Sequence, residues 1–215
     1  MPNIDRSYGF EPVDWNGACK FVRPYEVASN AGAIAEGDAV AAEQDASTAY
    51  GVVDRAAAGS GYIVGVAMWF EWKDSYGIQR WGSYYDAATG DTDRIAFVVD
   101  DPRVRFRLQS RDDATASQLT HIFSNADHLD TAPTQTGPYS GFSNHELDLN
   151  TLTQSAGATC RIENRWPSSA NAFGTSTTNN LHGEYIVRIG EHFRGPIVSI
   201  SDSGAKQMLI PLPAV

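Results

Sequence analysis

Cysteine is scarce in this sequence, and long apolar runs are missing from it. Only two of the 215 residues are cysteines, Cys19 and Cys160, and their spacing does not fit a C-x-x-C pair. A metal centre or a disulfide scaffold is therefore not expected, and free buried thiols are favoured over a bridge. Residues 1–5 contain no basic region followed by an apolar run, so no ordinary signal peptide is expected. No stretch approaches the roughly 18 apolar residues of a membrane-spanning helix, so no membrane contact is expected.

Positive charge is also in short supply. The 16 lysines and arginines face 26 acidic residues, which gives a formal net charge of −10. A protein that binds nucleic acid normally carries a basic stripe, so this balance argues against a nucleic-acid partner. Lysine occurs only at positions 20, 73 and 206, and the other cations are arginines. Arginine is favoured at protein interfaces, but GC-rich codon usage explains the same bias equally well.

The short motifs of common catalytic sites do not occur. The sequence has no G-x-S-x-G elbow, no P-loop and no G-x-G-x-x-G segment. Its histidines form no H-x-H or H-x-x-x-H pair of the kind that binds zinc, and each is expected in a loop or on the surface. The five are His121, His128, His145, His182 and His192. We therefore expect a protein that is not an enzyme and needs no cofactor.

Acidic residues allow two further interpretations. Asp86, Asp91 and Asp93 share one segment, but they lack the register of a calcium loop, so a solvated turn is favoured. A glycosidase needs two carboxylates across a cleft, and the sequence does not select a pair among several strand-associated glutamates. These candidates are Glu71, Glu146, Glu163 and Glu184.

Glycine, proline and aromatic residues, by contrast, are plentiful. The 19 glycines and 10 prolines suit many short strands joined by tight turns, and 23 aromatic residues exclude disorder of the whole chain. The strongest strand is Tyr62–Trp72, which is apolar on both faces and should be central, with Gly65 allowing close approach of a neighbour. Pro24 indicates that residues 21–27 form an edge strand or contain a β-bulge. Other strands are expected at 38–42, 50–54, 94–99, 103–109, 146–149, 159–164 and 185–189.

The segments 94–99 and 103–109 flank the turn sequence Asp100-Asp101-Pro102 and resemble a strand pair. In the second segment three apolar residues alternate with Arg103, Arg105 and Arg107, which predicts a half-exposed strand of an antiparallel sheet. These three arginines, the arginine row, either bind an acidic partner or, as we favour, form the solvent-exposed (wet) face of a strand, paired with carboxylates. One helix is expected, at Asp112–Phe123.

The expected organisation is a β-rich body over residues 19–194 between two arms, 1–18 and 195–215. The first arm carries apolar anchors, although a first strand tucked into the core is about as well supported. Long polar loops are expected at 73–93, 130–144 and 165–183, and loops of this length are usually functional or mobile. The fold class is therefore mainly β, an antiparallel β-barrel or β-sandwich body with one short helix and extended N- and C-terminal arms.

Candidate contact residues come from the arms, the aromatic loops and the arginine row. Aromatic side chains and arginine are the residue types most enriched in protein interfaces. The candidates are Ile4, Tyr8, Phe10, Trp15, Trp81, Tyr84, Tyr85, Arg103, Arg105, Arg107, Trp166, Phe173, Leu209 and Ile210.

An ordered series of short segments spans most of residues 9–192. The segments are Gly9–Val13, Gly37–Val40, Gly51–Gly59, Ile63–Val66, Val98–Pro102, Val104–Phe106, Glu146–Asp148, Tyr185–Ile189 and Glu191-His192. In this order they resemble the capsid decoration, or cement, proteins of tailed bacteriophages, and the tail after Gly195 is not matched.

This resemblance implies a β-barrel or β-sandwich seated on the outer surface of the virion head, after a period in the host cytoplasm. Its implied partners are the major capsid protein and copies of itself, most simply as a homotrimer, with a dimer as the other option. The family supplies no catalytic residues. Two alternatives remain from the residues themselves: a carbohydrate- or receptor-binding module with aromatic loops, and a jelly-roll hydrolase with paired carboxylates.

Overall fold

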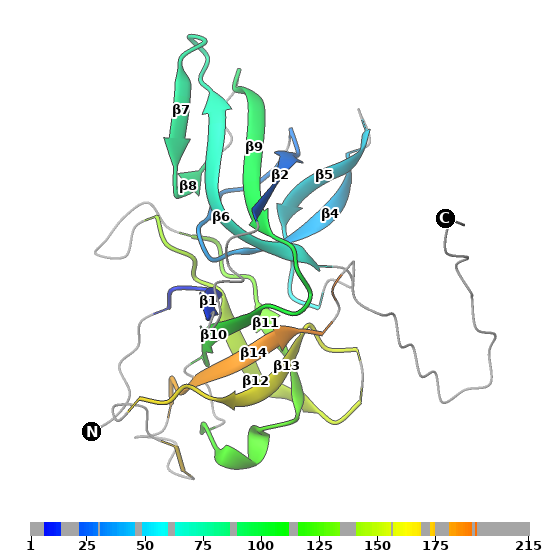
Figure 1. Cartoon of the computed structure of the whole chain (residues 1–215), viewed down its shortest axis with the longest axis vertical. Helices are drawn as coiled ribbons and strands as arrows, with labels where there is room; N and C mark the ends of the chain where they lie inside the picture. The colour runs from blue at the N-terminus through cyan, green and yellow to red at the C-terminus, as the bar shows by residue number, and fades with distance from the viewer. Residues whose placement is uncertain are drawn as a thin grey trace, which may run out of the picture.

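The chain is folded almost entirely into β strands. The computed structural model describes residues 7–13, 22–29, 31–45, 49–59, 63–86, 90–111, 116–133, 141–155, 157–168, 173–174, 181–190 and 192. Two six-stranded sheets lie one above the other in the view of Figure 1, and a two-stranded pair accompanies the upper one. The prediction of a mainly β fold is confirmed.

The upper sheet closes into a barrel. Its strand order is β4-β5-β2-β9-β6-β7, and an additional pairing of β4 with β6 joins five strands in a ring and leaves β7 on the outside of β6. The small pair β3–β8 lies beside it. The strands are β2 (Val22–Val27), β3 (Ile34–Ala35), β4 (Ala39–Asp45), β5 (Ala49–Arg55), β6 (Ile63–Lys73), β7 (Gln79–Gly82), β8 (Tyr84–Tyr85) and β9 (Thr92–Val99).

The lower sheet is also curled, although less completely than the barrel. Its order is β1-β10-β14-β13-β11-β12, and a bridge between Ser110 and Leu147 brings β12 back to the end of β10. The elements are β1 (Glu11–Val13), β10 (Arg105–Gln109), β11 (Asn125–Leu129), β12 (Glu146–Thr153), β13 (Cys160–Arg165), β14 (Glu184–Ile189) and the 3-10 helix η2 (Leu119–His121).

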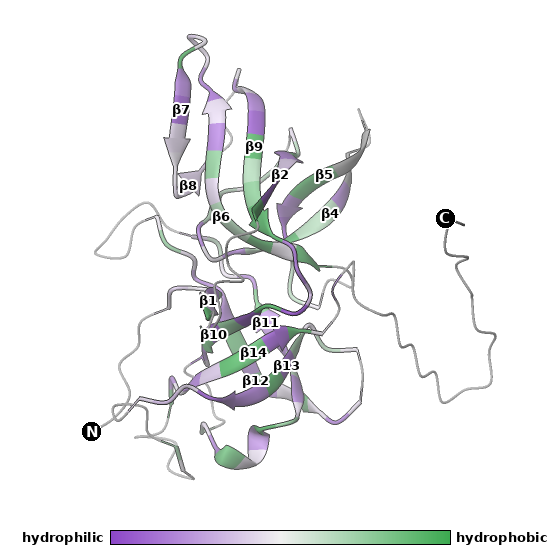
Figure 2. Cartoon of the chain, in the orientation of Figure 1, coloured by the Kyte–Doolittle hydropathy of each residue, from purple (hydrophilic) through white to green (hydrophobic). Residues whose placement is uncertain are grey.

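Two apolar cores hold the sheets together. One fills the barrel around Val40, Phe70 and Val98. The other fills the lower sheet and also includes Ile63 and Val66 of the barrel strand β6. Because β6 contributes to both cores, the two sheets are packed against each other and share apolar surface. In Figure 2 the apolar parts of β6 and β9 lie toward the lower sheet, and their polar parts lie toward the free end of the β6–β7 hairpin.

The strand expected at Tyr62–Trp72 is confirmed as β6, which pairs with β4, β7 and β9. Gly65 allows a close approach there: a Cβ atom at this position would overlap the carbonyl oxygen of Val99 and lie 2.7 Å from Cγ1 of Val98. Pro24 lies in the part of β2 that pairs with β9, whereas the pairing of β2 with β5 involves only Glu26 and Val27. The missing amide of proline is thus tolerated at a locally open edge.

The segments around Asp100-Asp101-Pro102 form strands as expected, but these strands do not pair with each other. β9 belongs to the barrel and β10 to the lower sheet, so the turn is the crossover between the two sheets. The alternation in β10 is as predicted, since Val104, Phe106 and Leu108 are buried. A turn sequence fixes the local chain direction but not the partner strand, so the predicted pairing of these two segments with each other is wrong.

Two other expectations are wrong within the described residues. The helix expected at Asp112–Phe123 is reduced to the single turn η2, with residues 112–115 outside the described part. The segment 73–93 is not one long loop, because it contains β7, β8 and the start of β9. The hairpin of β6 and β7 turns at Asp74, whose Oδ1 accepts hydrogen bonds from the amides of Tyr76 (2.9 Å) and Ile78 (3.0 Å).

The segment expected to be an N-terminal arm enters the fold where it is described. Residues 11–13 form β1, which pairs with β10, and Phe10 is 1% exposed, so the alternative of a first strand tucked into the core holds there. Residues 1–6 and 14–18, Cys19 and the second arm, 195–215, lie outside the described residues. Cys160 is buried with a free thiol. Among the described helical residues none forms a segment long and apolar enough to cross a membrane.

Candidate interaction surface

Two exposed tryptophans, Trp69 and Trp81, lie on the outer face of the barrel. Phe70 points into the barrel core, so the pleat of β6 directs Trp69, Glu71 and Lys73 outward. Register extends this face over the neighbouring strands, because Glu71 is opposite Trp81 on β7 and Trp69 is opposite Phe97 on β9. β2 continues the row, with Pro24 opposite Phe97 and Glu26 opposite Ile95. We call Trp69, Trp81, Ile95, Phe97 and Pro24 the outer aromatic face.

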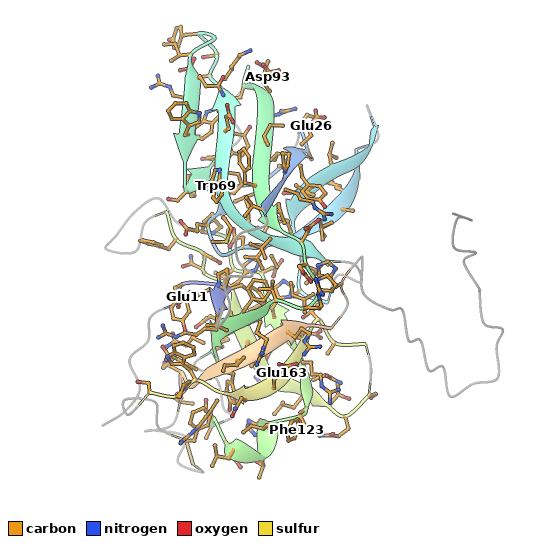
Figure 3. The ribbon with its side chains drawn as sticks, viewed as in Figure 1. Glu11, Glu26, Trp69, Asp93, Phe123 and Glu163 are labelled. Carbon is orange, nitrogen blue, oxygen red and sulfur yellow. The ribbon has the colours of Figure 1, made fainter. Side chains whose placement is uncertain are left out.

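This face presents flat rings to solvent. Trp69 is 43% exposed and Trp81 is 76% exposed, which is far more than a tryptophan in a core position retains. The ring of Trp69 stacks on that of Phe97, with centroids 5.0 Å apart and an interplanar angle of 22°. At the hairpin tip Tyr76 and Ile78 are also exposed. Figure 3 shows Trp69 on the upper sheet, below the labelled Asp93 and Glu26.

The strands beneath the outer aromatic face are held rigidly. On the inner side Tyr85 packs against Phe70 and, edge to face, against Trp72. On the outer side Nε2 of Gln79 donates a hydrogen bond of 2.8 Å to Glu71, which ties β7 to β6. A contact surface whose shape is set before binding loses little conformational entropy when a partner docks.

The arginine row predicted along β10 is dispersed among ion pairs. Arg103 pairs with Asp101, with Nη2 and Oδ2 2.8 Å apart, and remains well exposed. Arg105 lies 3.8 Å from Glu163 on β13. Arg107 binds Glu11 at 3.0 Å and also contacts Glu184. The interpretation of the row as the wet face of a strand is therefore confirmed.

Arg107 brings together three of the predicted contact residues. Its guanidinium lies 4.8 Å from the ring centre of Tyr8 and 5.0 Å from that of Trp166. The Tyr8 hydroxyl donates a hydrogen bond to Glu184 at 3.4 Å. The pKa of this hydroxyl is raised, mainly because the group is buried. These contacts fasten the segment before β1 to the lower sheet, which is a structural task for all three side chains.

Other predicted contact residues are buried or lie outside the described residues. Phe10 and Tyr85 are each 1% exposed, so the prediction that they contact a partner is wrong for the folded chain. Tyr84 is half-buried in β8, opposite Ala35. Phe173 packs edge to face on Tyr185 with centroids 5.0 Å apart. The residues outside the described part are Ile4, Trp15, Leu209 and Ile210.

The five histidines are all buried, which corrects the expectation of surface positions, whereas His145 and His182 do lie in loops. His128 and His145 are fully buried at the junction of the two sheets, with ring centroids 5.0 Å apart. Nε2 of His128 donates to the carbonyl of Ala56 at 3.2 Å. The amide of Ala39 donates to Nδ1 of His145 at 3.3 Å. Histidines of the lower sheet thus satisfy backbone groups at the base of the barrel.

Asp38 completes this polar junction. Its Oδ2 accepts a hydrogen bond of 2.8 Å from the amide of Ala35, and its Oδ1 lies 3.6 Å from Nε2 of His145. Burial raises the pKa of Asp38 to about 7 and lowers the pKa of His145 well below its usual range. Both shifts favour neutral side chains. Because Asp38 and His145 are completely buried, the cluster acts in folding and is closed to a substrate.

The glutamates considered for a glycosidase do not converge on one site. Glu71 lies on the barrel, whereas Glu163 and Glu184 lie on the lower sheet and are paired with arginines. Glu146 lies at the start of β12. Within the described ranges there is no group of three or more histidine, cysteine, aspartate or glutamate side chains placed to hold a metal ion.

Sequence reasoning missed the exposed position of Trp69. It lies within the most apolar strand, and such a strand is expected to be covered on both faces. A signal was present, because the polar residues Glu71 and Lys73 follow Trp69 at alternate positions and mark the outward face of β6. Comparison of the chain with protein-family models, with curated proteins and with solved structures finds no match.

Proposed function

We propose that this chain is a decoration protein of a tailed-bacteriophage head and that the outer aromatic face binds the capsid. The observation that carries the proposal is a rigid sheet face with two exposed tryptophans, Trp69 and Trp81. Tryptophan is among the residues that most often dominate the energy of protein interfaces, and water-exposed tryptophans gain most when a partner covers them. The series of segments that resembles cement proteins supports the choice of the head as the partner.

A head under outward load from its DNA gains from a protein that binds only the expanded lattice. Such binding stabilises the expanded state by mass action, without any chemistry. The net charge of −10 keeps the free protein soluble until it docks. Repeated copies on the lattice would each add a contact between capsid subunits.

Replacing both Trp69 and Trp81 with alanine is expected to weaken binding to expanded heads by about 100-fold or more, since each side chain has the size and exposure of an interface anchor. Binding is measured by co-sedimentation of purified protein with expanded heads that lack it.

The matched control is Phe123→Asn, which removes an aromatic side chain that is 67% exposed at the far end of the lower sheet. Phe123 has a φ of 72°, a value that asparagine tolerates. This variant should bind as the unaltered chain does. Equal binding by the tryptophan variant, with an unchanged melting temperature, would remove the outer aromatic face from the proposal.

A second candidate function, binding of neutral sugars, has one observation in its favour. The Trp69 ring lies flat on Phe97 with one side open, and the Glu71–Gln79 pair lies on the same outward side of the sheet. A flat ring beside hydrogen-bonding groups suits the apolar face and hydroxyl rim of a pyranose. A glycan array probed with the unaltered chain and with Trp69→Ala decides between the two functions. If the array shows no signal that depends on Trp69, this candidate is eliminated.

A further inference from the structure

Like charges face each other at two places on the outside of the lower sheet. Arg161 on β13 is directly opposite Arg188 on β14. Asp127 on β11 is directly opposite Asp148 on β12. Directly opposed like charges destabilise a sheet, so two such pairs in one sheet are a cost that folding alone does not explain.

The arginine pair belongs to a positively charged group. Among the described residues Glu163 is the carboxylate that contacts this group: it binds Arg188 and lies 3.8 Å from Arg105. Arg105 and Arg188 remain 48% and 44% exposed in their side chains, and Arg161 is exposed as well. Arg105 and Arg188 thus share one glutamate, and Arg161 has no ion pair among the described residues, which leaves a surplus of positive charge there in a chain that is acidic overall.

The aspartate pair is fixed by the backbone and has no cation. Asp127 accepts a hydrogen bond of 3.0 Å from the amide of Thr159. Asp148 accepts one of 3.0 Å from the amide of Asn150. Within the part of the chain that the structure describes, neither carboxylate is ion-paired. The two aspartates therefore hold negative charge at fixed positions on the half-buried outer side of the sheet.

The two groups are neighbours on one surface. Asn125 is opposite Arg161, which makes β11 the strand next to β13, and Asp127 follows two residues later on the same side of β11. The arginine pair on β14 and β13 therefore lies diagonally beside the aspartate pair on β11 and β12, one outward position farther along β11 than Asn125. A surface with a positive half beside a negative half is complementary to a copy of itself rotated by 180°.

We propose that two copies of this chain associate through this charged face about a two-fold axis, so that Arg161 and Arg188 of each copy lie against Asp127 and Asp148 of the other. A second copy supplies both signs of charge in the required order, whereas a polyanion would be repelled by the aspartate half. The contact relieves the opposed like charges in both chains at once, and charge complementarity fixes the register of the two sheets.

This inference does not rest on the proposed function, because the charged face belongs to the lower sheet and the outer aromatic face belongs to the barrel. A dimer formed in this way would carry two outer aromatic faces. Where both reach the same head, the second contact forms at a raised effective concentration.

The test is the mass of the free protein, measured by sedimentation equilibrium at low and high salt. The unaltered chain is expected to be dimeric at low salt and to dissociate as salt rises, because exposed charges are screened. Asp127→Asn with Asp148→Asn keeps an oxygen acceptor at each position and should raise the dimer dissociation constant at least about 100-fold. Arg161→Glu with Arg188→Glu should also give monomers, and Arg80→Glu on the barrel hairpin should leave the dimer intact.

The decisive mixture combines the Arg161→Glu, Arg188→Glu chain with an Asp127→Lys, Asp148→Lys chain. Restored opposite charges should recover a mixed dimer from two chains that are each monomeric. A trimer, a dimer indifferent to all these changes, or an unaltered chain that stays monomeric up to its solubility limit would each overturn the two-fold contact. Circular dichroism of every variant separates loss of association from loss of folding.

Discussion

Alanine at Gly65 is expected to lower the free energy of unfolding by at least about 3 kcal/mol, or to prevent folding of the barrel. The added Cβ atom would overlap the carbonyl oxygen of Val99 on the neighbouring strand and would crowd Val98. Backbone on β9 cannot yield without breaking its pairing with β6, and β6 is shared by both apolar cores. Urea unfolding followed by tryptophan fluorescence measures the loss.

Gly32→Ala is the matched control for this substitution. A Cβ atom at Gly32 would meet no atom within 4 Å, and its φ is not in the left-handed region. The control is therefore expected to change stability by no more than about 0.5 kcal/mol. If Gly65→Ala behaved in the same way, the close approach of β6 and β9 would be wrong.

Acid is expected to destabilise the protein strongly, by at least about 2 kcal/mol between pH 7 and pH 5. Burial lowers the pKa of His121, His128, His145 and His192 in the folded chain. The unfolded chain, in which histidine has a pKa of about 6.5, therefore binds more protons as the pH falls. The stability that the buried neutral histidines contribute is therefore present above about pH 6.5 and is lost as the pH falls below it.

Asp38 acts in the opposite direction. Its pKa is raised to about 7 in the folded chain, mainly by burial, from an ordinary value of about 3.9. The folded state keeps the proton that the unfolded state releases, so this contribution is fully present below about pH 3.9 and is lost as the pH rises from there to about 7. Between pH 7 and pH 5 Asp38 therefore offsets part of the loss caused by the histidines, and above pH 7 it adds no further change.

Urea unfolding at a series of pH values measures this dependence. Asp38→Asn should make the loss of stability between pH 7 and pH 5 steeper, because it removes the opposing contribution of Asp38 and leaves the histidines unchanged. A stability that stays constant between pH 7 and pH 5 would contradict the account of buried neutral histidines at the junction of the sheets.

The strands were predictable from the sequence because their pattern is local. Alternation of Val104, Phe106 and Leu108 with arginines placed β10, and the apolar run through Val64 and Phe70 placed β6. Sheet membership was not predictable, since β9 and β10 follow each other along the chain yet belong to different sheets. Pairing depends on contacts between segments far apart in the sequence, which no local pattern records.

The contact surface was harder to predict for the same reason. Trp81 was selected because it stood in a polar segment, and it is exposed. Tyr85 was selected from that segment on the same grounds, but β8 places it on the inner side of the barrel sheet, where it packs on Phe70. His128 and His145 had no local pattern at all, because their hydrogen-bond partners Ala56 and Ala39 lie on other strands.

The copy number of this chain on a purified phage head tests the proposed role as a decoration protein most directly. Quantitative mass spectrometry of intact particles, with the major capsid protein as the internal standard, gives the ratio of the two chains. A protein that covers the capsid lattice should be present in hundreds of copies and in a simple ratio to the capsid subunit. A handful of copies per particle, or none, would contradict the proposal.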